Sequence, residues 1–150
     1  MDSSIAVADR QRSMTTTFSI TRHVQFSETD MAGVVHFSNY FRWMEETEHA
    51  FFRSIGVSIA MSHTSDALGW PRVSTTCLYM RPVRFEDEVL CQLVVQRVGA
   101  GSLTHEVTFL VRGEPVARGS MTVACCTLVH GELRSQPIPA AVRARFPVLD

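Results

Sequence analysis

Residues 26–40 read FSETDMAGVVHFSNY, a turn-prone segment that runs directly into a long amphipathic helix pattern. The acid Asp30 and the flexible Gly33 stand in the turn, and the helical pattern begins near Phe37. A helix start offers unpaired N–H groups and a partial positive charge. A carboxylate beside such amides could activate water and hold a developing oxyanion in one small site. The alternative is that Asp30 caps the turn or the helix, as aspartate commonly does.

The helix pattern covers residues 37–55, where apolar side chains recur with a period close to 3.6 residues. The apolar positions are Phe37, Tyr40, Phe41, Met44, Phe51, Phe52 and Ile55. Three acids, Glu45, Glu46 and Glu48, fall on the outward or partly covered side. Gly56 follows the pattern and is typical of a helix stop. We therefore expect one long helix here.

The rest of the chain is rich in β-strand patterns. Residues 18–26 alternate in part between apolar and polar side chains, which is typical of a strand. The later expected elements are a loop at 57–69, strands at 73–83, 88–98, 103–111 and 116–129, and a short helix at 140–146. One long helix followed by successive strands predicts an α+β fold, with an antiparallel meander curled around the helix. Because one helix cannot cover a wide sheet, a partner subunit is expected to cover the remainder.

The composition is that of an ordinary folded protein. The chain has 150 residues, 45% of them hydrophobic and 19% charged, with a formal net charge of −1. The near-neutral charge gives no basic field that would indicate nucleic acid binding. Residues 1–16 are polar and without period, so we expect a disordered tail there and a single domain over residues 17–150. Without an apolar signal or spanning segment, the expected location is the cytoplasm.

The four cysteines stand at positions 77, 91, 125 and 126 and never in a CxxC spacing. The adjacent pair, Cys125 and Cys126, is poorly placed to form a mutual bridge. We interpret all four as small core residues of a protein in a reducing compartment.

Within residues 24–56, the run T-D-x-x-G-x-V and then N-Y-x-R-W-M-E resemble the signature of the 4-hydroxybenzoyl-CoA thioesterase family of hotdog-fold proteins. The resemblance implies an antiparallel sheet wrapped around one long central helix, assembled as a homodimer or homotetramer. It also implies hydrolysis of acyl-CoA or acyl-carrier-protein thioesters, without a metal or organic cofactor and without nucleic acid or membrane partners.

The resemblance implies catalytic roles for several residues in and after the turn that contains Asp30. Asp30 aligns with the family's catalytic carboxylate, which serves as general base or as nucleophile. Phe37 matches the position whose backbone N–H polarises the thioester carbonyl, and Gly33 would let the backbone turn closely beneath the thioester. His36 stands one residue before a histidine of some members and could protonate the leaving thiol. A lone histidine at this point is more often structural.

The resemblance also suggests substrate contacts. Tyr40 and its aromatic neighbours suit an apolar acyl pocket, although core packing explains them equally well. Glu45 aligns with an acidic position that faces the acyl pocket in members acting on aromatic acyl groups; the alternative is a solvated glutamate. The candidate arginines for CoA phosphates are Arg81, Arg84, Arg97 and Arg134. Glu45 and His49 have a metal-compatible spacing, but no third ligand is apparent, so no metal site is expected.

Two other functions compete with hydrolysis. A hotdog hydratase or dehydratase would carry an Asp and a His with four residues between them, in a D-x-N-P-x-H motif, whereas five residues stand between Asp30 and His36 here. A non-catalytic module that binds acyl thioesters would tolerate loss of the acid. The retained Asp30 argues against such a module.

Overall fold

The computed structural model describes residues 16–59 and 67–147 of the chain. In chain order the elements are β1 (Thr17–His23), η2 (Phe26–Glu28), α2 (Asn39–Ser54), β2 (Leu68–Gly69), β3 (Arg72–Tyr79), β4 (Glu88–Val98), β5 (Ser102–Val111), β6 (Glu114–Ala124), β7 (Cys126–Val129), β8 (Glu132–Ser135) and α3 (Ala140–Arg143). The tail expected over residues 1–16 lies outside the described residues except for its last position.

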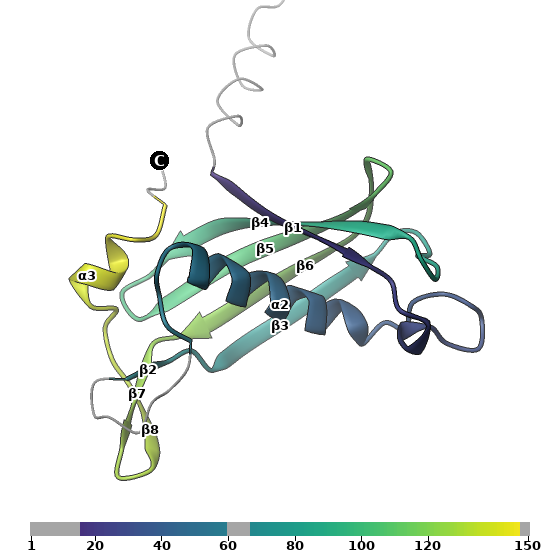
Figure 1. Cartoon of the computed structure of the whole chain (residues 1–150). Helices are drawn as coiled ribbons and strands as arrows, with labels where there is room; N and C mark the ends of the chain where they lie inside the picture. Colours follow the sequence, from purple (N-terminus) through teal and green to yellow (C-terminus); the bar gives the residue numbers. More distant parts are fainter. Residues whose placement is uncertain (1–15, 60–66, 148–150) are drawn as a thin grey trace, which may run out of the picture.

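Five strands form one antiparallel sheet in the order β1-β4-β5-β6-β3, and α2 lies across one of its faces (Figure 1). Along β5 every second side chain is buried, as expected when one face of a sheet packs on a helix. The predicted α+β fold, an antiparallel sheet around one long helix, is confirmed. None of the helices in the described ranges is long and apolar enough to cross a membrane.

The predicted four-strand meander is correct only for β4, β5 and β6. The strand expected at residues 73–83 ends at Tyr79, and it pairs with β6 at the sheet edge, not with β4. Pro82 lacks the N–H that a strand ladder needs, so the chain leaves the sheet before it. The following residues then pass to the far side of β5, where β4 begins. This crossover carries the buried Val83 to the end of the sheet near η2.

The single strand expected at residues 116–129 is two strands in two sheets. β6 ends at Ala124, and β7 pairs with β2 and β8 in a separate three-stranded sheet. Cys125 and Cys126 are consecutive and both buried, and the break between β6 and β7 falls at Cys125. Cys91, Cys125 and Cys126 are buried free thiols, as predicted for core residues, whereas Cys77 is a free thiol that is only partly buried.

The end of α2 confirms the predicted stop at Gly56. This glycine has φ +74°, in the left-handed region, and the Val57 N–H donates to Phe52 O at 2.9 Å. The Arg145 guanidinium donates to the Gly56 carbonyl at 2.8 Å and covers the negative end of the helix. The start of α2 differs from the prediction: the helix begins at Asn39, two residues after Phe37.

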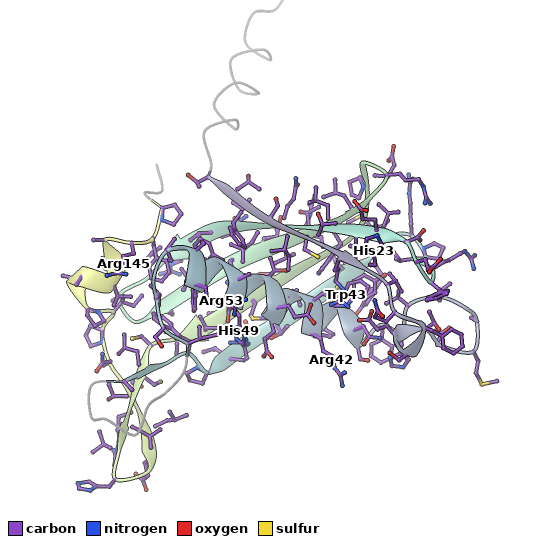
Figure 2. All side chains as sticks on the ribbon, in the orientation of Figure 1. His23, Arg42, Trp43, His49, Arg53 and Arg145 are labelled. Atoms are coloured by element: carbon purple, nitrogen blue, oxygen red, sulfur yellow. The ribbon has the colours of Figure 1, made fainter. Side chains whose placement is uncertain are left out.

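The core lies between α2 and the sheet. Trp43 and Met44 of the helix are fully buried, whereas the neighbouring Arg42 is exposed (Figure 2). A Cβ on Gly119 of β6 would lie 2.0 Å from the Met44 sulfur, so the glycine allows α2 to pack closely on this strand. The helix and the sheet therefore form one rigid support for the residues that precede Asn39.

Candidate active site

Asp30 lies in a tight hairpin between η2 and α2. The Asp30 N–H donates to Val34 O at 2.8 Å, and the Gly33 N–H donates to Asp30 O at 2.9 Å. Gly33 has φ +76°, a conformation that glycine adopts without strain. At the base of the hairpin the His36 N–H donates to Glu28 O at 2.8 Å. These short-range bonds fix the turn that the sequence predicts.

The two carboxylate oxygens of Asp30 have different surroundings. Oδ1 accepts the Ala32 N–H at 2.8 Å and the Val34 N–H at 3.4 Å, so this oxygen caps the turn. No donor among the described residues reaches Oδ2. The capping alternative is thus correct for one oxygen, and the other is available to a water or a substrate.

Glu28 holds the hairpin against the rest of the domain. Its carboxylate accepts two bonds from the Arg22 guanidinium, at 2.8 and 2.9 Å, and one from Trp43 Nε1 at 2.7 Å. It also accepts the Gln25 N–H at 2.8 Å. The Arg22 guanidinium lies 4.7 Å from the centre of the Trp43 ring, a cation–π arrangement. β1, the hairpin and α2 therefore meet at one charge-assisted network.

Phe37 lies in the turn between the hairpin and α2. Its side chain is 60% exposed, so the expectation that it begins the helix core is wrong. Ser38 occupies the N-cap position, and the Asn39 N–H donates to His36 O at 3.0 Å. Within the described part of the chain no acceptor reaches the Phe37 N–H. This amide can therefore donate to a ligand.

Asp30 and Phe37 share one pocket of about 370 Å³. Its lining residues are Asp30, Val34, Val35, Phe37, Tyr40, Tyr79, Met80, Arg81, Pro82 and Val83. Burial raises the pKa of Tyr40 to about 12, so this phenol is neutral at physiological pH. The lining combines a carboxylate, a free amide, aromatic rings and one arginine. The aromatic rings suit an apolar acyl group, and the free amide can polarise its carbonyl.

His36 and Glu45 lie outside the pocket lining. His36 is exposed, and its Nδ1 is 2.7 Å from Ser38 Oγ while its ring lies 4.5 Å from that of Phe37. Glu45 is on the exposed side of α2, where its carboxylate accepts a bond from Arg72 at 3.1 Å. Neither residue therefore contributes to the pocket in this structure.

The four candidate arginines divide into two groups. Arg81 lines the pocket, and its Nη1 lies 3.6 Å from Glu114 Oε2. The backbone of Arg84 pairs with that of Val34 in the hairpin that contains Asp30, which we call the acid hairpin. Arg97 is near the far end of β4, and Arg134 is on β8, in the small sheet at the other end of the domain (Figure 1). A single protomer thus presents Arg81 and Arg84 near Asp30.

A buried cluster of titratable side chains lies beneath α2, which the sequence pattern does not predict. Glu48 and His105 are each 1% exposed, with 3.2 Å between Glu48 Oε2 and His105 Nε2. Arg72 Nη1 approaches Glu48 Oε1 to 2.9 Å from the sheet edge. The outward placement expected for Glu48 is wrong because its position falls between Met44 and Phe52 on the buried stripe.

Burial controls the ionisation of this pair. Desolvation raises the pKa of Glu48 to about 7, against the opposing effect of Arg72. Desolvation and then the Arg72 charge lower the pKa of His105 to about 4. Between these values the pair is neutral, with one proton on Glu48. None of these three residues is among those that line the pocket.

The sequence also missed Tyr79 as a site residue. Its hydroxyl donates to Phe37 O at 3.1 Å, and its ring meets that of Tyr40 at 5.1 Å. Tyr79 is the last residue of β3 and is 42 positions from Phe37. No sequence signal indicates a contact at that separation.

Comparisons with known proteins place this geometry in context. The family model described as the thioesterase-like superfamily matches residues 24–146. A 1,4-dihydroxy-2-naphthoyl-CoA hydrolase of Synechococcus sp. (strain CC9311) is 31% identical over 107 residues, which cover 67% of this chain and 70% of the relative.

Two solved structures share the arrangement of sheet and helix. A gentisyl-coenzyme A thioesterase has a TM-score of 0.74 and 28% identity, over 83% of this chain and 98% of its own. A mutant of 4-hydroxybenzoyl-CoA thioesterase complexed with 4-hydroxybenzoyl-CoA has a TM-score of 0.78 and 18% identity, over 86% of this chain and 97% of its own. At that identity the second likeness is one of fold.

Proposed function

The chain belongs to the thioesterase-like superfamily and is a thioester hydrolase, and from that premise we propose that it hydrolyses acyl-CoA thioesters at the pocket shared by Asp30 and Phe37. The family membership confirms the resemblance found in residues 24–56. The observation that carries the proposal is the pairing of one unsatisfied carboxylate oxygen with one unsatisfied amide in the same pocket.

The reaction needs these two groups in complementary roles. Asp30 Oδ2 takes a proton from the attacking water, or it adds to the thioester carbon and water then cleaves the resulting anhydride. In either route the C–S bond breaks, a proton goes to the leaving thiol, and the acid product remains. The Phe37 N–H donates to the carbonyl oxygen as negative charge develops on it. The position of Gly33 supports this geometry because it allows the tight turn behind Asp30.

An aromatic acyl group is the substrate class that we propose. The pocket carries the rings of Phe37, Tyr40 and Tyr79, and its volume of about 370 Å³ suits a compact acyl group. The relatives named above are a naphthoyl-CoA hydrolase and a gentisyl-CoA thioesterase, which supports the same class. For the phosphates of CoA we propose Arg81, which lines the pocket, and Arg84, whose backbone pairs with Val34.

A panel of thioesters tests this function. Aromatic and aliphatic acyl-CoA esters are compared with matching N-acetylcysteamine and acyl-carrier-protein esters, and the free thiol is measured. We expect turnover of aromatic acyl-CoA, with KM rising by severalfold at high salt for the CoA esters but not for the N-acetylcysteamine esters, which carry no phosphate, because salt screens the arginine–phosphate contacts. Absence of thiol release from every ester would contradict the function. A marked preference for the carrier-protein esters would replace CoA by the carrier as the substrate.

We also propose that the protein acts as a homodimer or a higher homo-oligomer. β3 forms an edge of the five-stranded sheet, and Val73 and Leu78 on it are 64% and 69% exposed. A free edge with apolar side chains favours pairing with another chain. Light scattering at micromolar concentration should give a particle mass of at least twice that of the monomer. The Leu78→Lys variant should give a smaller particle mass, because a charge on this edge opposes pairing. A well-folded wild-type monomer would contradict the assembly.

A further inference from the structure

The two peptide groups on either side of the Phe37 Cα are both held by hydrogen bonds. The first peptide group carries the His36 carbonyl and the Phe37 N–H, and its oxygen accepts the Asn39 N–H at 3.0 Å. The second carries the Phe37 carbonyl, which accepts the Tyr79 hydroxyl at 3.1 Å. A peptide group is planar, so the bond to His36 O fixes the direction of the Phe37 N–H, while the bond to Phe37 O fixes the peptide group that follows. The Phe37 Cα joins the two groups, so both bonds restrict the rotation of the turn.

Asn39 connects this turn to the acid hairpin. Its side-chain Nδ2 donates to Glu28 O at 2.8 Å and to His36 O at 3.3 Å. The side chain is buried, with 8% of the residue exposed. The distance between Asp30 and the Phe37 amide is therefore set by bonds at the common base of both segments.

Tyr79, at the end of β3, donates a hydrogen bond to this turn from the edge of the sheet. The Phe37 side chain is largely exposed and cannot anchor its own backbone by burial. The Tyr79 ring is held against Tyr40 in an edge-on contact with an interplanar angle of 74°. Desolvation first, and then the neighbouring Cys77, raise the pKa of Tyr79 to about 12, so the hydroxyl is a donor at neutral pH.

We infer that Tyr79 is a positioning residue, whose hydroxyl holds the Phe37 turn so that the Phe37 N–H points at the thioester carbonyl oxygen. This inference rests on the proposed function. The hydroxyl binds the Phe37 carbonyl and limits rotation about the Phe37 Cα, and its effect on the substrate passes through the Phe37 N–H on the preceding peptide group. Loss of the hydroxyl leaves the ring, the pocket and Asp30 in place but lets the turn rotate.

The Tyr79→Phe variant tests the inference, because it removes the hydroxyl alone. A hydrogen bond of this kind contributes about 0.5–1.5 kcal/mol, so we expect kcat to fall by roughly three- to tenfold. KM should stay within about twofold, because the bond serves the transition state. Ser54→Ala is the matched control: it removes another hydroxyl-to-carbonyl bond, from Ser54 to Phe51 at 2.6 Å, at the far end of α2, and should leave kcat unchanged.

Infrared difference spectra provide a measurement that a purely structural role would not change. An aromatic acyl-CoA with a ¹³C-labelled carbonyl is bound to an Asp30→Asn background, with and without Tyr79→Phe. A weaker bond from the Phe37 N–H should move the carbonyl stretch to higher frequency in the double variant. An unchanged kcat with an unchanged carbonyl frequency would overturn the inference while the hydrolase function stands. A wild-type protein inactive on every thioester would instead overturn the proposed function.

Discussion

The Asp30→Asn variant is expected to release thiol from an aromatic acyl-CoA with a kcat lowered by roughly 10²–10⁴-fold and with little change in KM. Asparagine keeps an oxygen that can accept the Ala32 N–H at the Oδ1 position, so the turn should persist. The substitution replaces the unsatisfied Oδ2 with an amide group that is neither a base nor a nucleophile. The loss therefore falls on the chemical step.

Thermal unfolding of the same variant separates catalysis from capping. If Asp30 only caps its turn, asparagine should serve nearly as well and both Tm and kcat should stay close to wild type. Asp87→Asn is the control for the loss of a turn-capping carboxylate, because Asp87 accepts the Arg84 N–H at 2.9 Å in a turn outside the pocket lining, where its side chain is 18% accessible and pairs with Arg112. A folded Asp30→Asn protein with near wild-type turnover would remove Asp30 from the mechanism.

The parts of this site that the sequence predicts are the parts that local bonds determine. Asp30, Gly33 and the Phe37 amide lie within eight consecutive residues, and the hydrogen bonds of Asp30 and Gly33 join positions two to four apart. The order of acid, glycine and helix start is therefore visible in the residues themselves. The end of α2 at Gly56 is visible for the same reason.

The parts that the sequence does not predict depend on the path of the chain. Tyr79 reaches Phe37 only because β3 lies at the sheet edge, and that placement follows from a crossover that no local pattern specifies. Glu48 was expected outward because glutamate is rarely buried without a partner. Its partners, His105 and Arg72, come from two strands that follow the helix by many residues. A local pattern does not contain that information.

The buried Glu48–His105 pair gives the fold a pH dependence whose sign follows from the two pKa values. The pKa of Glu48 rises on folding from 4.5 to about 7, so its contribution to stability is complete below pH 4.5 and is lost as pH rises through 7. The pKa of His105 falls from 6.5 to about 4, so its contribution is complete above pH 6.5 and is lost as pH falls toward 4. The two slopes cancel between pH 4.5 and 6.5.

The Glu48→Gln variant should therefore gain stability relative to wild type as pH rises. Glutamine has nearly the same volume and a polar end group, but it does not ionise. Its contribution to stability is therefore independent of pH. The change from 4.5 to about 7 in the pKa of Glu48 corresponds to roughly 3 kcal/mol at about 1.4 kcal/mol per pH unit. We expect the difference in unfolding free energy, variant minus wild type, to increase by about that amount between pH 4 and pH 8.

Urea unfolding across this pH range measures the unfolding free energies of the variant and of wild type. The protein concentration is kept the same throughout, because subunit association would change the apparent stability with concentration. Glu132→Gln is the control: Glu132 is an exposed acid on β8 whose side chain is 71% accessible, and its replacement should give a curve parallel to wild type. Parallel curves for Glu48→Gln and wild type would mean that Glu48 carries the same proton in the folded and unfolded chains. In that case Arg72, 2.9 Å from Glu48, would offset the whole cost of burying the carboxylate.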